Sequence, residues 1–311
     1  MARKKTATGK KRSIGWYLAH DWQLWVMLLP AIIYIFIFCY VPMYGVQLAF
    51  REYDFKAGIY GGKWVGFKYF KQFFDSAMFG TTLRNTFVTA ALSIVLGFPA
   101  PIVLAMIINQ IRQQKWKRIV QTTVYIPYFI STVVMCGMLT LFLNPTSGIF
   151  NIIITKLGGE SVNFLQDPAN FKWIYVLSAV WQEMGWGSII YFATLSGVDR
   201  SLLEAAEIDG ANRFQKIWYI NVPVLIPTII ILLILQCGSL LSVGYEKVYL
   251  LQNTTNLSGS EVISTYVYKV GLEQADFSFG AAADLFNSVI NSTILILANF
   301  IAKRTTDQGL F

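Results

Sequence analysis

Long stretches without a charged residue constrain this chain more than any other feature of its sequence. Five of them run through residues 22–50, 85–111, 119–155, 217–245 and 285–302. A sixth, residues 173–198, is interrupted only by Glu183. Each can hold the roughly 20 apolar residues that a helix needs to cross a bilayer, although the last is near the lower limit. We therefore predict an all-α integral membrane protein with six membrane-spanning helices.

Composition and the distribution of charge agree with this prediction. Apolar residues make up 55% of the chain and charged residues 14%, whereas soluble domains carry about 25% charged residues. If the N-terminus is cytoplasmic, the inner segments hold 15 Lys and Arg in 60 residues, and the outer segments hold 10 in 90. Since Lys and Arg concentrate on the cytoplasmic side, we expect both termini inside. The net charge of +8 then lies at the inner membrane edge, and no nucleic-acid partner is expected.

The same pattern predicts how the chain is organised. It consists of a basic cytoplasmic N-terminus (1–23), a first membrane anchor (24–50), an extracytoplasmic loop (51–80), a core transmembrane domain (81–302) and a cytoplasmic tail (303–311). Three cysteines, Cys39, Cys136 and Cys237, fall within apolar stretches, so neither a disulfide framework nor a metal cluster is predicted. The sequence has no Ser-His-Asp set, no metal-ligand spacing and no phosphate-binding Gly-Lys loop. Any energy-converting site is therefore expected on another subunit.

A polar segment at residues 198–227 lies between the fourth and fifth spans. Ser201 and Glu204 have the spacing of a capping box, which predicts that a short helix starts there. Gly210 is expected to end that helix in a left-handed conformation, and Asn212 with Gln215 to cap a second helix at once. The segment is therefore predicted to form a short helix, a tight turn and a second helix.

The faces of the two predicted helices differ in size. Ala205 and Ala206 keep one face of the first helix small, while Phe214, Ile217 and Trp218 give the second helix an apolar stripe. Such a hairpin fits a groove on a partner protein. An amphipathic loop lying on the membrane surface is the alternative that these residues leave open.

Glu183 is the only charge within a predicted span. On a helix it shares a face with Gln182 and Trp186, and an intramembrane carboxylate is costly to bury. These three residues are our candidates for the substrate path. The alternatives are a structural carboxylate paired with a neighbouring helix, or one that faces a water-filled cavity without touching a ligand.

Two other polar features leave alternatives open. Asn85, Thr89 and Ser93 form a stripe on the second span, for which helix-to-helix hydrogen bonding is favoured over lining a conduit. The outer segment 244–284 is rich in tyrosine and carboxylates. It could form a docking surface or a partial re-entrant helix.

Residues of the 198–227 segment also carry a family resemblance. Its Glu204, Ala205, Ala206, Asp209, Gly210 and Ala211, followed by Pro223 and Pro227, resemble the EAA loop of permease subunits of binding-protein-dependent ABC importers. The wider stretch from Trp181 to Pro227, WQEMGWGSIIYFATLSGVDRSLLEAAEIDGANRFQKIWYINVPVLIP, resembles carbohydrate importers, specifically the maltose-permease-like permeases for oligosaccharides and polysaccharides. Arg200 departs from this pattern, because many members have proline there.

The resemblance implies a type I ABC importer permease fold with cytoplasmic coupling helices between spans four and five. It implies a non-catalytic subunit of the bacterial cytoplasmic membrane that forms half of a translocation path for a sugar or oligosaccharide. The implied partners are a second, similar permease, two cytoplasmic ATPase subunits that hold ATP and Mg, and an extracytoplasmic solute-binding protein. The residues implied in coupling to the ATPase are Glu204, Ala205, Ala206, Asp209, Gly210, Ala211, Phe214 and Pro223.

Three other functions are alternatives to this one. An importer for a peptide or amino acid would share the coupling loop, because fold does not determine substrate. An ion-coupled secondary transporter would use several intramembrane carboxylates, whereas the predicted spans hold one charge. A membrane enzyme would need clustered acid, base or metal groups, which the spans lack.

Overall fold

The computed structural model describes residues 20, 22–306 and 309–310, and within them the regular structure is helical apart from two isolated bridges. The prediction of an all-α protein is confirmed for this part of the chain. Most of the basic N-terminus predicted at 1–23 lies outside the described residues. The α-helices are α2 Trp22–Ile35, α3 Gly58–Gly61, α4 Lys68–Phe74, α5 Phe79–Leu92, α6 Pro99–Asn109, α7 Gln114–Tyr125, α8 Thr132–Phe142, α9 Ile149–Lys156, α10 Pro168–Ser196, α11 Arg200–Ile208, α12 Arg213–Lys216, α13 Val222–Cys237, α14 Tyr245–Leu251, α15 Leu257–Ser260, α16 Ile263–Val267 and α17 Phe277–Thr306.

Several long helices contain a wider turn just before a proline. Segments with π-helical geometry at Phe36–Tyr40, Ser93–Gly97 and Ile217–Asn221 end two residues before Pro42, Pro99 and Pro223, respectively. Proline has no backbone N–H to bond the preceding turn and its ring crowds that turn, so the turn opens while the helix continues. The π segments join α5 to α6 and α12 to α13 as continuous rods.

Four helices in the described chain are long and apolar enough to cross a membrane: Trp22–Phe50, Phe79–Asn109, Arg213–Cys237 and Phe277–Thr306. A fifth is obtained only if Gln114–Phe129 and Thr132–Phe142, which meet at a 97° bend, are counted as one span. The predicted third span, within the uncharged stretch 119–155, is therefore sharply bent in the structure. The predicted fourth span corresponds to α10, which has 29 residues but is not among these helices, so the count of six is not confirmed.

The bend has a local cause in the chain. Pro127 lies in a 3₁₀ turn after α7, and Ile130 is extended with ψ of 125°. The side chain of Ser131 then accepts a hydrogen bond from the Val134 N–H and starts α8 in a new direction. A proline signals a break, but it does not give the angle at which the chain resumes.

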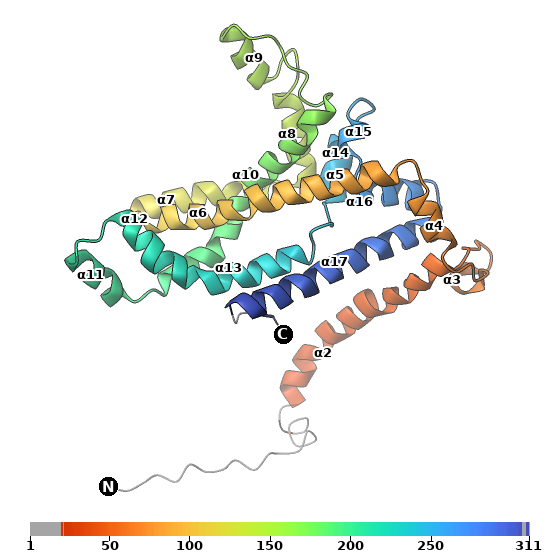
Figure 1. Ribbon diagram of the computed structural model, residues 1–311, viewed down its shortest axis with the longest axis horizontal. Coiled ribbons are helices and arrows are strands. Elements are labelled where there is room, and N and C mark those ends of the chain that lie inside the picture. The colour runs from red at the N-terminus through yellow and green to blue at the C-terminus, as the bar shows by residue number, and fades with distance from the viewer. Residues whose placement is uncertain (1–19, 21, 307–308, 311) are drawn as a thin grey trace.

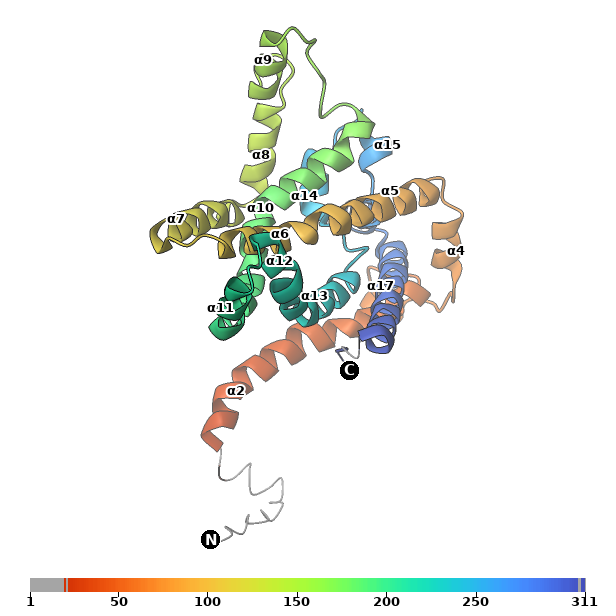
Figure 2. The same ribbon diagram turned by 60° about the vertical axis from the view of Figure 1, so that its left-hand side comes forward.

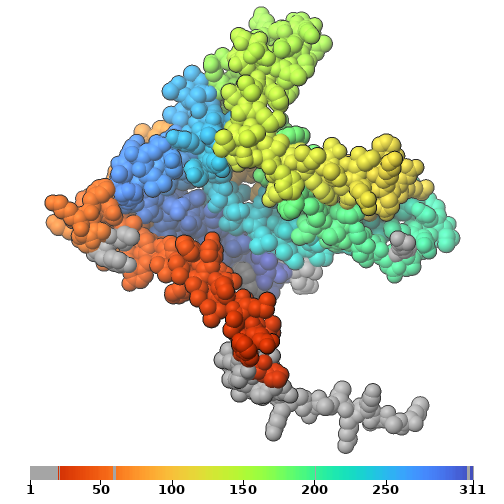
Figure 3. Space-filling model, turned by 180° about the vertical axis from the view of Figure 1, so that it is seen from behind, coloured from red at the N-terminus to blue at the C-terminus, as the bar shows by residue number. Residues whose placement is uncertain are grey.

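The long helix α10 packs against five other helices, α5, α6, α7, α13 and α15. Figure 1 shows α5, α6, α13 and α17 running along the long axis, with α11 at one end and α3 and α4 at the other. The arm formed by α8 and α9 leaves this body on one side and α2 on another (Figure 2). Both also project from the body when it is seen from behind (Figure 3).

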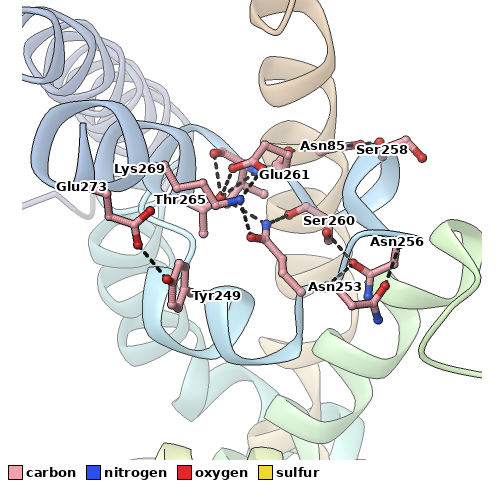
Figure 4. A network of polar contacts seen from close by, with 12 residues as sticks. Asn85, Tyr249, Asn253, Asn256, Ser258, Ser260, Glu261, Thr265, Lys269 and Glu273 are labelled. Carbon is pink, nitrogen blue, oxygen red and sulfur yellow. Dashed lines mark hydrogen bonds and ion pairs between the residues drawn. The ribbon is translucent and has the colours of Figure 1, made fainter. Parts of the chain in front are cut away.

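The outer segment contains the short helices α14, α15 and α16, which a buried polar network holds together (Figure 4). Glu261 is 2% exposed and accepts hydrogen bonds from Lys269 at 2.6 Å and Thr265 at 2.8 Å. The Asn85 amide of α5 donates to the carbonyl oxygens of Ser258 and Glu261, both at 3.0 Å. Because these donors satisfy irregular backbone, the segment is fixed to the helix body.

A second anchor of the outer segment lies before α10. Asn253 and Asn256 both donate through their amides to the carbonyl oxygen of Leu165, at 2.9 and 2.8 Å. Gly259 packs so closely on Pro168, the first residue of α10, that an added Cβ would lie 2.2 Å from its carbonyl oxygen. These contacts set the position of α15 and the loop before it relative to the start of α10.

We expect Gly185→Ala to lower the free energy of unfolding by about 1–3 kcal/mol or more, since overpacking a tight contact typically costs that much. A Cβ at Gly185 on α10 would lie 1.8 Å from the carbonyl oxygen of Val124 on α7, so the two helices would have to separate. Thermal unfolding of the purified protein in detergent measures the effect. Gly137→Ala on α8 is the matched control, because its Cβ meets no atom within 4 Å. Equal transition temperatures for the two variants would contradict the close crossing.

Candidate functional site

The first candidate site is the hairpin formed by α11 and the start of α12. The helix α11 begins earlier than predicted, because Asp199 and not Ser201 is its N-cap. The Asp199 carboxylate accepts the Ser201 N–H at 2.9 Å, and this hydrogen bond lowers the pKa of that carboxyl. The predicted capping box of Ser201 and Glu204 is therefore wrong: a carboxylate two residues earlier caps the helix and also interacts favourably with its positive end. Arg200 occupies the first helical position, where proline is equally acceptable, so its departure from the family pattern leaves the cap intact.

The turn of the hairpin has the predicted geometry. Gly210 has φ of +76°, and a Cβ there would meet no atom within 4 Å. Glycine is therefore required by the backbone conformation and not by lack of space. Asn212 and Gln215 form a reciprocal capping box, with hydrogen bonds of 2.9 and 2.7 Å, which confirms the predicted start of the second helix.

The second arm is not a separate helix, as the hairpin prediction implied. From Arg213 the chain runs through α12, a π segment and α13 as one 25-residue helix ending at Cys237. The arms are also joined by an ion pair that sequence reasoning missed, in which Lys216 Nζ lies 2.7 Å from Glu207 Oε1. The hydrogen bond from Lys216 lowers the pKa of the Glu207 carboxyl. Nine residues separate the pair, and only the turn at Gly210 brings them together.

The hairpin presents most of its side chains to its surroundings. No described side chain of α11 is buried, and Ile208 and Phe214 are 86% and 74% exposed. Of the predicted coupling residues, Ala206 and Ala211 are half-buried; the exposed ones are Glu204, Ala205, Asp209, Gly210, Phe214 and Pro223. The exposed apolar residues of α11, Leu202 and Ile208, were not singled out in the sequence.

The second candidate site is a cavity of about 450 Å³ between the α5–α6 rod, α10 and α13. Its polar lining comes from Ser93, Tyr175, Glu183, Tyr191, Gln236, Ser239 and Ser242. Among the described residues that line it, Glu183 is the only charged one, and its side chain is exposed to the cavity. Hydroxyl, amide and carboxylate groups at these positions can exchange hydrogen bonds with a hydroxyl-rich solute.

The structure divides the predicted face of α10 between the cavity and the bend. Glu183 lines the cavity, whereas Gln182 Nε2 donates to the carbonyl oxygen of Ile130 at 2.8 Å. Trp186 stacks on Tyr128, with ring centroids 4.6 Å apart and an interplanar angle of 5°. The two candidates beside Glu183 therefore contact the bend between α7 and α8.

The polar stripe on the second span is also divided. The favoured prediction for this stripe is hydrogen bonding between helices. Asn85 does form hydrogen bonds to another part of the chain, but its partners are backbone carbonyl oxygens of Ser258 in α15 and of Glu261. Thr89 is buried, and Ser93 lines the cavity. One stripe therefore serves both packing and cavity lining, which its spacing alone could not separate.

Asn291 of α17 fixes the cavity-lining residues that follow α13. After Cys237 the helix unwinds, and Asn291 Oδ1 accepts the N–H of Leu241 at 2.9 Å. Asn291 Nδ2 donates to the hydroxyl of Ser242 at 3.1 Å, which orients that cavity residue. In the described part of the chain, no group of three or more His, Cys, Asp or Glu side chains could hold a metal ion.

Comparison with known proteins places these features in a family. Residues 97–307 match the family described as "Binding-protein-dependent transport system inner membrane component". Protein LplB of Bacillus subtilis (strain 168) is 40% identical over 302 residues, which cover 96% of this chain and 95% of that protein. The polygalacturonan/rhamnogalacturonan transport system permease protein YteP of the same organism is 41% identical over 302 residues, covering 97% and 94%.

Solved structures agree along nearly the whole chain. One chain of a bacterial alginate ABC transporter, in complex with an alginate pentasaccharide-bound periplasmic protein, matches with a TM-score of 0.87 at 39% identity, covering 95% of this chain and 99% of that one. A chain of a bacterial ABC transporter "involved in the import of the acidic polysaccharide alginate" matches with a TM-score of 0.86 at 39% identity, covering 93% and 98%. The chain therefore belongs to the family of inner membrane components of binding-protein-dependent transport systems.

Proposed function

We propose that this chain is the membrane-spanning subunit of an ATP-driven importer and forms half of the translocation path for a sugar or oligosaccharide. The observation that carries the substrate class is the near full-length similarity to an alginate transporter, supported by a relative named for polygalacturonan transport. The cavity supports the proposal because its hydroxyls, amide and carboxylate suit a hydroxyl-rich solute. The distribution of Lys and Arg supports a bacterial cytoplasmic membrane location with both termini inside.

The proposed partners are a second, similar permease, two cytoplasmic ATPase subunits that hold ATP and Mg, and an extracytoplasmic solute-binding protein. The hairpin of α11 and α12 is the proposed contact with the ATPase. Its exposed apolar residues support this role, because a groove on a partner would bury them. A second support is the continuous helix from Arg213 to Cys237, which links the hairpin to cavity residues Leu232 and Gln236.

Transport by the complete complex in vesicles tests the substrate class. The purified binding protein, ATP and labelled oligosaccharides or peptides are supplied in parallel. Saccharide uptake that requires ATP and the binding protein is the expected result. Uptake of peptides or amino acids with no saccharide uptake would overturn the proposal.

Gly210→Val is expected to leave the protein inserted but to uncouple it, reducing ATP-dependent transport at least about tenfold. A β-branched residue is strained at positive φ, at a cost of about 1–3 kcal/mol, so the turn should open and redirect α11. Gly158→Val is the matched control, because Gly158 also has positive φ, with open space, but lies outside the hairpin. Gly210→Asn should retain more transport, since Asn tolerates this conformation. Full transport by Gly210→Val would exclude this role for the turn.

Ala205→Leu is expected to weaken association with the ATPase. Ala205 is exposed in this chain, so the variant should fold, while a close contact with a partner would be overpacked by about 1–3 kcal/mol. Co-purification of the ATPase at graded salt and detergent concentrations measures the loss, which is about 5- to 150-fold in affinity for that energy. Ala205→Ser is the control, because it changes volume little. Equal recovery of the ATPase with both variants would count against this placement.

Glu183→Gln is expected to reduce transport of a neutral oligosaccharide about tenfold at limiting concentration. A hydrogen bond to a charged acceptor is worth about 1.5–3 kcal/mol, and the amide retains only part of it. Uptake and ATPase stimulation in vesicles, after a check of assembly, measure the change. Glu160→Gln is the control, because Glu160 is exposed and lies outside the cavity. A second variant, Trp186→Ala, tests a different feature, the bend between α7 and α8, because Trp186 packs on Tyr128. Parental rates for Glu183→Gln at every concentration would exclude substrate contact at Glu183.

A further inference from the structure

A buried cation lies behind the wall of the cavity. Lys247 on α14 is 8% exposed, and its ammonium has no hydrogen-bond partner. Its Nζ lies 5.2 Å from the centre of the Tyr175 ring, and Tyr175 lines the cavity. Burial removes the hydration of an ammonium, and an aromatic face replaces only part of it. Lys247 therefore needs a negative charge nearby.

Glu183 supplies a negative charge on the cavity side. The carboxylate of Glu183 and the ammonium of Lys247 interact electrostatically, but the ion pairs found among the described residues do not include them. The two charges therefore attract one another over a distance longer than an ion-pair contact. At such distances each charge also contributes to the electrostatic potential inside the cavity. The described residues lining the cavity include no Lys or Arg, so Lys247 is the cation that offsets Glu183.

The position of Lys247 is fixed by the packing of α14. Its carbonyl oxygen lies 3.9 Å from the thiol of Cys136 on α8. At the end of α14, the Gln252 side chain bonds the Ser260 carbonyl at 3.1 Å and Lys269 Nζ at 2.9 Å, within the network around Glu261. The backbone of α14 that carries Lys247 is therefore anchored next to the cavity.

We propose that Lys247 is a specificity-determining residue of the cavity that admits saccharides carrying carboxylate groups. This inference rests on the proposed function and adds the charge of the solute. Alone, the Glu183 carboxylate would repel a uronate, because bringing like charges together in a binding site is unfavourable. With Lys247 beside it, Glu183 accepts hydrogen bonds from hydroxyls while the ammonium attracts the uronate carboxylate. The similar proteins named for polygalacturonan and for the acidic polysaccharide alginate agree with this solute class.

The test uses the complete transporter, with its partner subunits, in vesicles. The probes are a uronic-acid trisaccharide and the same trisaccharide with its carboxyl groups reduced to alcohols. The readout is the ratio of the two transport rates, acidic over neutral. We expect Lys247→Met to lower this ratio about tenfold or more and Glu183→Gln to raise it. Lys156→Met is the control: it removes an exposed lysine at the end of α9 and should leave the ratio unchanged.

The ratio separates selectivity from a structural defect, since a defect lowers both rates together. An unchanged ratio in Lys247→Met, with both trisaccharides carried by the parental transporter, overturns the inference but not the proposed function. If the parental transporter carries the neutral trisaccharide but not the acidic one, the inference is overturned and the proposed function stands. If neither trisaccharide is carried, the proposed function fails and the inference falls with it. Should Lys247→Met fail to assemble, an unchanged ratio in Glu183→Gln overturns the inference.

Discussion

Where water cannot reach, as in a bilayer or a buried contact, a peptide group that a helix break leaves without a partner must be satisfied by another part of the chain. Three breaks show how this is done. At the bend between α7 and α8, Gln182 donates to the carbonyl of Ile130 and Ser131 caps α8. After α13, Asn291 accepts the N–H of Leu241. At the outer segment, Asn85 bonds two carbonyl oxygens.

This constraint explains why polar residues in the apolar stretches were difficult to assign from sequence. A polar side chain on a membrane helix either satisfies backbone elsewhere or lines a cavity, and both uses have the same helical spacing. Asn85 and Gln182 belong to the first kind, and Ser93 and Glu183 to the second. The distinction depends on where neighbouring helices break, which hydrophobic patterns do not reveal.

The parts of the chain that were predicted correctly are those governed by local backbone chemistry. Gly210 with Asn212 and Gln215 specified a turn and a cap that need no distant partner. The start of α11 was missed because two nearby residues can cap a helix and the carboxylate of Asp199 prevailed over Ser201. The bend and the burial of Lys247 were missed because each depends on contacts between segments far apart in sequence.

The π-helical segments have a consequence for how related chains compare. A π turn holds one residue more than the α turn it replaces, and each residue of a helix advances its faces by about 100°. Removing one residue from Ser93–Gly97 would restore a regular α turn and leave α6 at almost the same rotation about the rod, so Pro101 would still line the cavity. The wider turn thus absorbs an extra residue without changing the faces that the two halves of the rod present. Family members that lack it should show a single-residue gap there, with the side chains on either side of the gap in the same positions.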